Sequence, residues 1–361
     1  MRVLELYSGI GGMRAALELS GLAFEIARAL DVNDLANSVY NSAYNCSDAS
    51  NRALESLSEE ECLLFGADLW TMSPPCQPFT RMGNQKRGKD TRCSSLLIII
   101  QLIRRIKPPA VMLENVKGFE GSDAWCAILE ALIACDYDVR QFLLTPLQFG
   151  IPNCRLRYYL VARLRTHNKQ RMFSFGTSVD DLKGSFEKLA SAIIRTPPCD
   201  VSPMPNCECG VCTNKVGGIA STENHFLEYI PFCHPIADYL LPECEIPEDL
   251  FLGQNELEKY YTILDIVTPE NRKSACFTKG YAQRFEGTGS FLEVPQPSRS
   301  NSTSFPKIRA FHSKEIARLL CFPEYFDFPA TVSEKQRRRL LGNSLNVLVV
   351  AHIMNWAFST V

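Results

Sequence analysis

The segment Ser73-Pro74-Pro75-Cys76-Gln77-Pro78 sets one cysteine among three prolines, directly after a predicted strand. Because proline fixes the backbone φ angle, this pattern predicts a stiff loop that presents the thiol at the edge of a sheet. A buried structural cysteine needs no such frame. A thiolate in this position can act as a nucleophile, so Cys76 is the first candidate for chemistry.

Charged side chains follow two further predicted strands. Glu114-Asn115-Val116 comes at the carboxyl end of a strand, the edge where ligands of open α/β sheets bind. Arg155 and Arg157 alternate into another strand, so we expect both guanidinium groups on one face. Two cations on one face suit a phosphate or a thiolate. An isolated acid at a strand end is more often a cap or a surface group, so the combination carries the prediction.

Glycines between the first predicted strand and a helix, in Ser8-Gly9-Ile10-Gly11-Gly12-Met13, indicate a nucleotide-like cofactor. Glycine lets a ligand approach the backbone closely at the N-terminus of a helix. Asp31 lies 20 residues beyond Gly11, at the end of the second predicted strand, where a carboxylate can hold ribose hydroxyls. The spacing is G-x-G-G rather than G-x-G-x-x-G, and a tight turn alone also explains it.

The elements around these residues alternate, as in an α/β domain with a largely parallel sheet. Runs rich in β-branched and aromatic residues predict strands over 3–7, 24–30, 67–72, 111–114, 139–144 and 158–162. Apolar residues at three- and four-residue spacing predict helices over 12–19, 35–44, 95–106 and 124–134.

The regular pattern fades after residue 165, where Pro, Gly, Ser and Cys interrupt the chain until about residue 306. Helices over 313–320 and 345–356 then restore it, and we expect them to pack on the first domain. The length of 361 residues suits two domains. We place them at 1–165 with 306–361, and at 166–305.

The charges nearly balance, with 38 Lys and Arg against 40 Asp and Glu, so a polyanionic partner must be held by local patches. Residues 139–179 hold seven Lys and Arg and no acid, and residues 81–92 form a second basic segment. By contrast, 222–270 holds eleven acids and one Lys. We expect nucleic acid to avoid that acidic segment.

Fifteen cysteines, an odd number, fit free thiols in a reducing compartment. The longest nearly apolar run, 96–103, is too short to span a bilayer. We expect an intracellular protein, in the cytoplasm and also the nucleus, that is monomeric and has no membrane partner.

In this order and spacing, the motifs resemble those of the cytosine-5 methyltransferases. They are the glycine turn, Asp31, Ser73-Pro74-Pro75-Cys76-Gln77, Glu114-Asn115-Val116, Arg155-x-Arg157 and Gly342-Asn343-Ser344. Cys276-Phe277-Thr278 and Glu286-Gly287-Thr288-Gly289-Ser290 make the chain most similar to the branch that methylates cytosine 38 of aspartate tRNA, historically named DNA methyltransferase homologue two. The resemblance implies a Rossmann-like, S-adenosylmethionine-dependent catalytic domain and a smaller, loop-rich target-recognition domain over 166–305.

The resemblance also implies the chemistry. The Cys76 thiolate would add to C6 of the cytosine, so that C5 can attack the methyl group of S-adenosylmethionine. Glu114 would hold or protonate N3, and Arg155 and Arg157 would hold the base carbonyl or a phosphate. A base in the anticodon loop is already partly unstacked, so extruding it costs less than flipping a base out of a duplex.

By this resemblance, Ile10, Gly11 and Gly12 would approach the methionine part of the cofactor, and Asp31 its ribose. Leu54, Glu55 and Ser73 would lie on the adenine side, and Ser344 would close the pocket. S-adenosylhomocysteine would be the product. The chemistry of the family needs no metal. One group of residues nevertheless has a spacing that suits zinc: Cys207, Cys209 and Cys212, with Cys199, Cys233 and His234 around them. It lacks a clean second pair, and we expect a cysteine-rich insertion without metal.

Three other functions share parts of this pattern. A dehydrogenase would need a third glycine in the turn and no Pro-Pro-Cys loop. An inactive nucleic-acid-binding module would lack one of the four catalytic candidates, and all four are present. A DNA cytosine-5 methyltransferase shares the whole reaction and differs only in substrate, so it is the main alternative, and we expect tRNA as partner with at most weak DNA binding. Two departures from the family, Asn153 in place of Gln and Cys321 in place of Gly, do not touch the expected chemistry.

Overall fold

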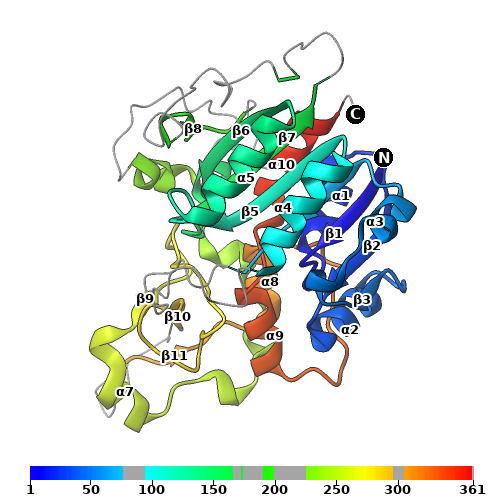
Figure 1. Ribbon diagram of the computed structural model, residues 1–361. Coiled ribbons are helices and arrows are strands. Elements are labelled where there is room, and N and C mark those ends of the chain that lie inside the picture. Colours follow the sequence, from blue (N-terminus) through cyan, green and yellow to red (C-terminus); the bar gives the residue numbers. More distant parts are fainter. Residues whose placement is uncertain (76–93, 166–171, 174–189, 199–224, 296–304, 360–361) are drawn as a thin grey trace. The chain divides into compact units, whose positions relative to one another are not determined.

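The computed structural model describes residues 1–75, 94–165, 172–173, 190–198, 225–295 and 305–359 (Figure 1). Cys76, the basic segment 81–92 and the cysteines at 199, 207, 209 and 212 lie outside these residues. The chain divides into two compact units, which are described separately. Unit 1 contains residues 1–144, 156–199 and 350–361, and unit 2 contains residues 145–155 and 200–349.

The centre of unit 1, in the described residues, is an eight-stranded sheet in the order β3-β2-β1-β4-β5-β7-β6-β8 (Figure 1). The strands are β1 (Arg2–Leu6), β2 (Glu25–Asp31), β3 (Ala49–Asn51), β4 (Leu69–Met72), β5 (Ala110–Val116), β6 (Tyr137–Leu144), β7 (Arg157–Leu164) and β8 (Ile193–Ile194). Neighbours pair in parallel except at β7, which runs antiparallel to both β5 and β6. The predicted α/β class with a largely parallel sheet is confirmed.

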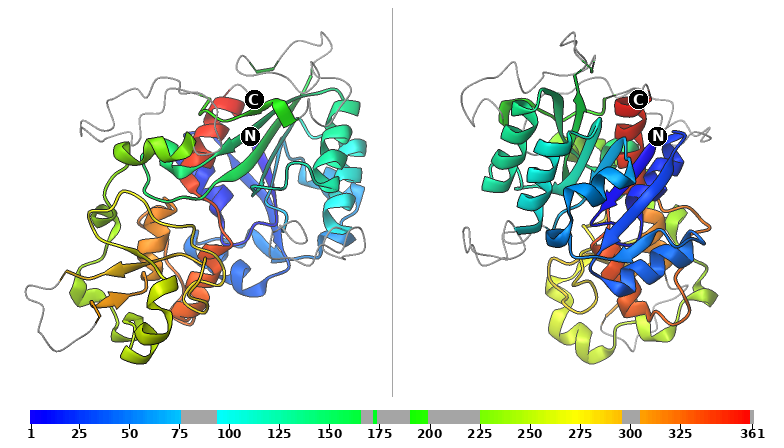
Figure 2. Two further views of the ribbon diagram at one scale, coloured as in Figure 1. Left: turned by 90° about the vertical axis from the view of Figure 1, so that its left-hand side faces the viewer. Right: turned by 45° about the vertical axis from the view of Figure 1, so that its right-hand side comes forward.

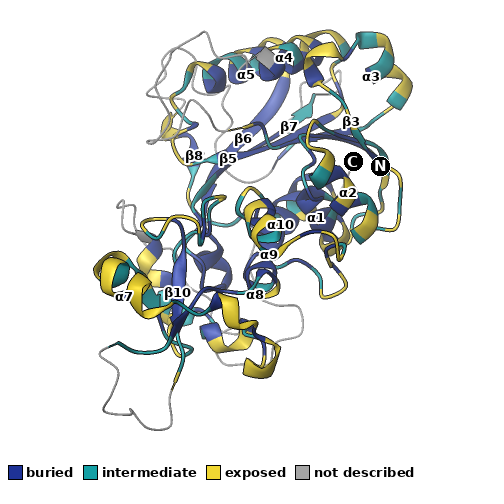
Figure 3. Cartoon of the chain, turned by 90° about the horizontal axis from the view of Figure 1, so that it is seen from below, coloured by how far each residue is buried: buried dark blue, intermediate teal, exposed yellow. Residues whose placement is uncertain are grey.

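Helices cover both faces of this sheet (Figures 2 and 3). They are α1 (Gly12–Ser20), α2 (Asp34–Ala43), α3 (Glu59–Phe65), α4 (Ser94–Ile106), α5 (Asp123–Ala134) and most of α10 (Val347–Phe358). Figure 3 shows α3, α4 and α5 on one face and α1, α2 and α10 on the other. Burial of apolar side chains between these layers stabilises the sheet; among the largest are Trp70 and Trp125, both 1% exposed or less.

Short polar caps fix where these helices begin. Asn33 accepts hydrogen bonds from the backbone N–H groups of Leu35 and Ala36 at the start of α2. Ser58 and Glu61 form a capping box at the start of α3. Because β2 ends at Asp31 and Asn33 caps α2, Asp31 lies at the edge of the sheet, directly before the turn into the helix.

Unit 2 contains fewer regular elements. A three-stranded sheet, in the order β11-β10-β9, is built from β9 (Asp265–Val267), β10 (Ser290–Glu293) and β11 (Ile308–Arg309). Its helices are α7 (Gln254–Tyr260), α8 (Ser313–Leu319) and α9 (Glu334–Gly342). The described part of unit 2 also contains several 3₁₀ segments, among them η3 (Pro146–Phe149) and η5 (His225–Phe232).

The units divide the chain at other places than the sequence prediction did. Helix α8, which was expected to pack on the first domain, belongs to unit 2, whereas α10 enters unit 1 at Val350. Within the described residues, the stretch Glu334–Phe358 is long and apolar enough to resemble a membrane span, but 67% of its apolar window is buried in the structure. Residues 343–346 also interrupt it. These features are those of core helices.

Candidate active site

The glycine turn between β1 and α1 has the geometry that the sequence predicted. Gly9 has a φ angle of 54° and Gly11 of 85°, both in the left-handed region. A side chain on Gly11 would place its Cβ 2.4 Å from the ring of Tyr44 and 2.9 Å from that of Tyr40. The Tyr44 hydroxyl also donates a hydrogen bond of 2.7 Å to the Gly11 carbonyl. Only glycine fits here, and Tyr40 of α2 and Tyr44, directly after that helix, hold the turn in place.

Asp31 faces the same turn from the end of β2. The Gly9 N–H donates to Oδ2 at 2.9 Å, and the Asn33 N–H donates to Oδ1 at 2.8 Å. Burial raises the pKa of Asp31 above its ordinary value, and these backbone hydrogen bonds oppose that rise. A carboxylate oxygen can accept more than one hydrogen bond. Asp31 therefore retains acceptor sites for a hydroxyl ligand beside the glycine turn.

Two serine hydroxyls at this edge of the sheet are buried and have no hydrogen-bond partner among the described residues. They are Ser8 Oγ, after β1, and Ser73 Oγ, after β4. β1 and β4 are paired neighbours, with Leu6 opposite Met72, so both serines follow the same edge. Buried polar groups are normally satisfied, and a bound polar ligand would satisfy these two. Ser8 was named in the motif but not as a site residue; its position directly before the glycines was the available signal.

The remaining residues predicted for the cofactor differ in exposure. Ile10, Gly11 and Gly12 are buried at the start of α1. Leu54 is 2% exposed and belongs to the hydrophobic core, whereas Glu55, its neighbour in the 3₁₀ turn η1 (Leu54–Ser56), is exposed. The glycine turn, Asp31 and the two serines suit a ligand with a ribose and a charged tail. These residues fit S-adenosylmethionine.

Glu114 and Arg157 form an ion pair at the carboxyl end of β5. Arg157 Nε lies 3.4 Å from Glu114 Oε1, and the two side chains are 14% and 10% exposed. Tyr159 is directly opposite Glu114 in the antiparallel pair, so Arg157 is its diagonal neighbour. The Asn115 amide donates to the Pro74 carbonyl at 3.3 Å. The structure thus brings together Glu114, Arg157 and the loop that leads to Cys76.

Arg155 differs from its prediction. Strand β7 begins at Arg157, so Arg155 precedes the strand instead of lying in it, and the expectation that both arginines share one face stays a prediction. Arg155 is 3% exposed. Its Nη1 contacts Cys276 Sγ at 3.3 Å and donates to the Phe277 carbonyl at 3.1 Å, and its Nη2 donates to the carbonyl of Ser344. In unit 2, Arg155 ties two motif segments together through their backbone.

The same two segments touch directly at Gly342. A Cβ on Gly342 would lie 2.3 Å from the Thr278 carbonyl carbon and 2.5 Å from the Lys279 nitrogen. Backbone atoms cannot move aside as a side chain can. The Gly342-Asn343-Ser344 motif is therefore packed against Cys276-Phe277-Thr278, and the position of Ser344 depends on this contact. Ser344 lies in unit 2, so its expected role beside the glycine turn of unit 1 stays a prediction.

The basic segment predicted over 139–179 is not a basic surface where the structure describes it. Arg140 is fully buried and pairs with Asp138, which directly precedes the segment. Arg165 pairs with Asp136 and Asp138, and Arg155 is buried. These charges are used inside the protein. Lys169 and Arg171 lie outside the described residues.

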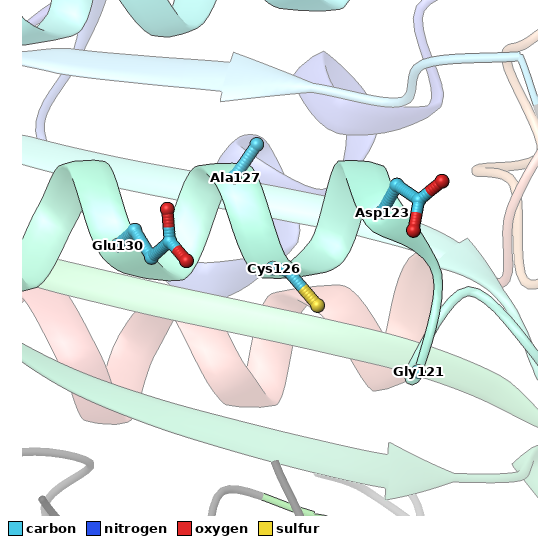
Figure 4. A pocket seen from close by; sticks show the side chains of 5 residues that line it. All are labelled: Gly121, Asp123, Cys126, Ala127 and Glu130. Carbon is cyan, nitrogen blue, oxygen red and sulfur yellow. The ribbon is translucent and has the colours of Figure 1, made fainter. Parts of the chain in front are cut away.

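The described residues also include a cavity along α5 and the buried Cys233. A cavity of 430 Å³ lies along α5 and is lined by Asp123, Cys126 and Glu130 but by none of the predicted site residues (Figure 4). In the described part of the chain, His, Cys, Asp and Glu nowhere gather in a group of three that could hold a metal ion. Cys233 is buried with its thiol 3.5 Å from the Leu147 carbonyl, and His234 Nδ1 lies 3.3 Å from Asp238.

A sheet with a glycine turn after β1, an acid at the end of β2 and a Ser-Pro-Pro segment after β4 is the arrangement of a Rossmann-like, S-adenosylmethionine-dependent methyltransferase. The C-5 cytosine-specific DNA methylase family matches residues 1–358, and the chain belongs to this family of cytosine-5 methyltransferases. C5 cytosine methyltransferases use S-adenosylmethionine as the methyl donor.

Relatives agree over nearly the whole chain. The tRNA (cytosine(38)-C(5))-methyltransferase of Rattus norvegicus is 35% identical, covering 98% of this chain and 98% of its own length. The DNA (cytosine-5)-methyltransferase of Dictyostelium discoideum is 34% identical, covering 98% of this chain and 93% of its own. The crystal structure of the Schizosaccharomyces pombe Dnmt2 methyltransferase superposes with a TM-score of 0.76 at 32% identity, covering 99% and 98% of the two chains.

Proposed function

We propose that this chain transfers the methyl group of S-adenosylmethionine to C5 of cytosine 38 in tRNA, with aspartate tRNA as the substrate. The supporting observation is the ion pair of Glu114 and Arg157 beside the loop that leads to Cys76. The rat relative, which aligns with 98% of this chain, is named for cytosine 38. An acid and a cation at this edge suit the edge of a pyrimidine ring, because one can hold N3 and the other a carbonyl oxygen.

The cofactor residues of the proposal are those of the glycine turn, the ribose acid and the hydroxyl after β4. Ile10, Gly11 and Gly12 offer backbone, Asp31 accepts from hydroxyls, and Ser73 has an unsatisfied hydroxyl. Ser8 joins this group for the same reason as Ser73. Leu54 and Glu55 are proposed for the adenine side, and Ser344 for closing the pocket. The bound cofactor supplies an electrophilic methyl group.

The Cys76 thiolate is proposed to form a bond to C6, which makes C5 nucleophilic. Glu114 gives a proton to N3, or shares one with it, as electron density moves into the ring. Arg157 keeps Glu114 oriented and balances the negative charge that Glu114 carries once it has given up its proton. After methyl transfer a water molecule takes the C5 proton, and the bond between Cys76 and C6 breaks with its electron pair on sulfur. N3 returns its proton to Glu114, so the thiolate and the acid are both regenerated.

Initial methylation rates test this proposal. Aspartate tRNA, the same tRNA with uridine at position 38, and duplex DNA are compared at matched salt. We expect methylation of the first substrate alone. Equal or faster methylation of DNA would instead support the reaction named for the Dictyostelium relative and leave the cytosine chemistry in place.

Two substitutions test the residue roles. Cys76→Ala is expected to abolish transfer while cofactor still binds. Glu114→Gln keeps the shape of the side chain but not the acid, and should reduce kcat by about 10² to 10⁴ fold. Glu130→Gln, an exposed acid of α5, is the matched control. A Glu114→Gln variant within about threefold of the control would remove Glu114 from the acid role.

The proposal includes a monomer in the cytoplasm and nucleus, without a metal or a membrane partner. Light scattering on the purified protein and imaging of a tagged chain test the assembly and the location. Retention of full activity after dialysis against a chelator tests the independence from metal.

A further inference from the structure

Glu5 is a carboxyl group in the middle of a buried strand. It is 0% exposed, and its strand neighbours Leu4 and Leu6 are apolar core residues. Opposite it in the sheet are Ala29 of β2 and Thr71 of β4, which carry no charge. Burying a carboxylate costs several kcal/mol unless it is paired. A purely structural strand would hold an aliphatic residue here.

The contacts of Glu5 lead to the glycine turn. The Tyr40 hydroxyl donates a hydrogen bond of 2.5 Å to Glu5 Oε2, while Oε1 is buried without a partner among the described residues. The ring of Tyr40 is one of the two that fill the space beside Gly11. The second ring, Tyr44, packs on Tyr40 with their centroids 5.1 Å apart and holds the Gly11 carbonyl. The carboxyl group thus anchors the side chain that sets the position of the turn.

Few other ionisable groups face Glu5. Among the described residues, Arg14 and Glu18 approach from α1, and Asp48 from the segment before β3. Arg14 lies over the rings of Tyr40 and Tyr44, at 5.6 and 4.5 Å from their centroids, and is itself paired with Asp48 at 2.7 Å. Burial raises the pKa of Glu5 to about 7, while the hydrogen bond from Tyr40 and the charge of Arg14 oppose the rise. Glu5 therefore changes its charge near neutral pH.

We propose that Glu5 is a positioning residue for the methyl donor: in its ionised form it holds Tyr40, and through Tyr40 the glycine turn, in the conformation that binds the cofactor. Hydrogen bonds to an ionised acceptor are roughly twice as strong as those to a neutral one. Protonation of Glu5 therefore weakens the hold on Tyr40. This inference rests on the proposed role of the turn in cofactor binding.

The experiment measures the affinity for S-adenosylhomocysteine by calorimetry between about pH 6 and pH 8. If only the ionised form binds, the competent fraction falls from about nine tenths to about one tenth, so wild type should bind about tenfold more weakly at the lower pH. Glu5→Gln accepts the same hydrogen bond and cannot ionise, so its affinity should vary much less. Asp31 and the ligand affect the affinity equally in both proteins, so the difference between the two pH curves reports on Glu5.

Tyr40→Phe is the second variant. It keeps the ring beside Gly11 but removes the hydroxyl through which Glu5 acts. Its affinity should therefore be lower than that of wild type at pH 8 and should vary little with pH. If Glu5→Gln does not fold, comparison of the Tyr40→Phe and wild-type binding curves tests the proposal.

The outcomes separate two failures. Parallel curves for wild type and Glu5→Gln, or a Tyr40→Phe curve with the same pH dependence as wild type, overturn the positioning role alone. A pH dependence seen with S-adenosylmethionine but not with S-adenosylhomocysteine also overturns it, because it would come from the charge of the sulfonium rather than from the turn. Absence of binding by wild type at every pH overturns the proposed function as well.

Discussion

Replacing Gly11 by alanine should destabilise unit 1 by about 2 to 5 kcal/mol. The left-handed backbone, with φ at 85°, costs a residue with a Cβ about 1 to 2 kcal/mol. The added methyl would overlap the rings of Tyr44 and Tyr40. Tyr40 is fully buried and Tyr44 is tied to the Gly11 carbonyl, so neither can move freely. Overpacking of this kind adds about 1 to 3 kcal/mol.

Two other glycines provide matched controls. Gly9 and Gly21 have φ angles of 54° and 74°, and nothing lies within 4 Å of a Cβ built on either one. Each alanine variant should therefore show the backbone strain alone, about 1 to 2 kcal/mol. Urea unfolding followed by tryptophan fluorescence is the assay, because all three tryptophans, at positions 70, 125 and 356, are in unit 1. If Gly11→Ala unfolds at the same urea concentration as Gly21→Ala, the tyrosine rings do not confine the turn.

Three further predictions concern stability. Folding raises the pKa of Glu5 from 4.5 to about 7, so the free energy of unfolding should fall by about 3 kcal/mol as pH rises through that interval. Urea titrations at several pH values measure this slope, and Glu5→Gln should remove it. Gly342→Ala should destabilise unit 2 by at least about 2 kcal/mol, whereas Gly280→Ala, whose Cβ would meet its nearest atom at 3.5 Å, should change thermal stability by less than half as much. Cys321 has a φ angle of 61°, in the left-handed region that favours glycine. The unfolding free energy of Cys321→Gly should therefore stay within about 1 kcal/mol of the wild-type value, while the β-branched Cys321→Val should melt at a clearly lower temperature. Equal melting temperatures of the two variants would contradict backbone strain at this position.

The elements of unit 1 could be predicted where a strong pattern covers several residues. The apolar β-rich runs at β1, β2, β4, β5, β6 and β7 were all found to within a few residues, because strands buried on both faces read as continuous apolar runs. β3 is only three residues long and carries Ser50 and Asn51, so it gives no such signal. The helix α3 was missed although its capping box, Ser58 with Glu61, was visible in the sequence.

The errors at the site come from partners that lie elsewhere in the chain. The spacing of Arg155 and Arg157 suggested one strand, but Arg155 instead bonds to carbonyls more than a hundred residues away. Arg140 counted toward a basic segment because Asp138, its partner, precedes that segment by one residue. Pairing of Glu114 with Arg157 needs the antiparallel insertion of β7 beside β5, and no local pattern encodes that register. The acid of β1 went unremarked because nothing in the sequence relates it to Tyr40.

The excursion of residues 145–155 has a consequence for protein engineering. These eleven residues leave the sheet after β6 and return before β7, yet they belong to unit 2. Leu147 packs with Tyr229 and Cys233, and the Asn153 amide bonds to Ser274 and Ala275. A fragment cut at residues 200 and 349 would lack these partners and expose the surface they cover. Exchange of this unit between relatives therefore requires two separate stretches of sequence, and a graft of the longer stretch alone would join mismatched halves of one folded body.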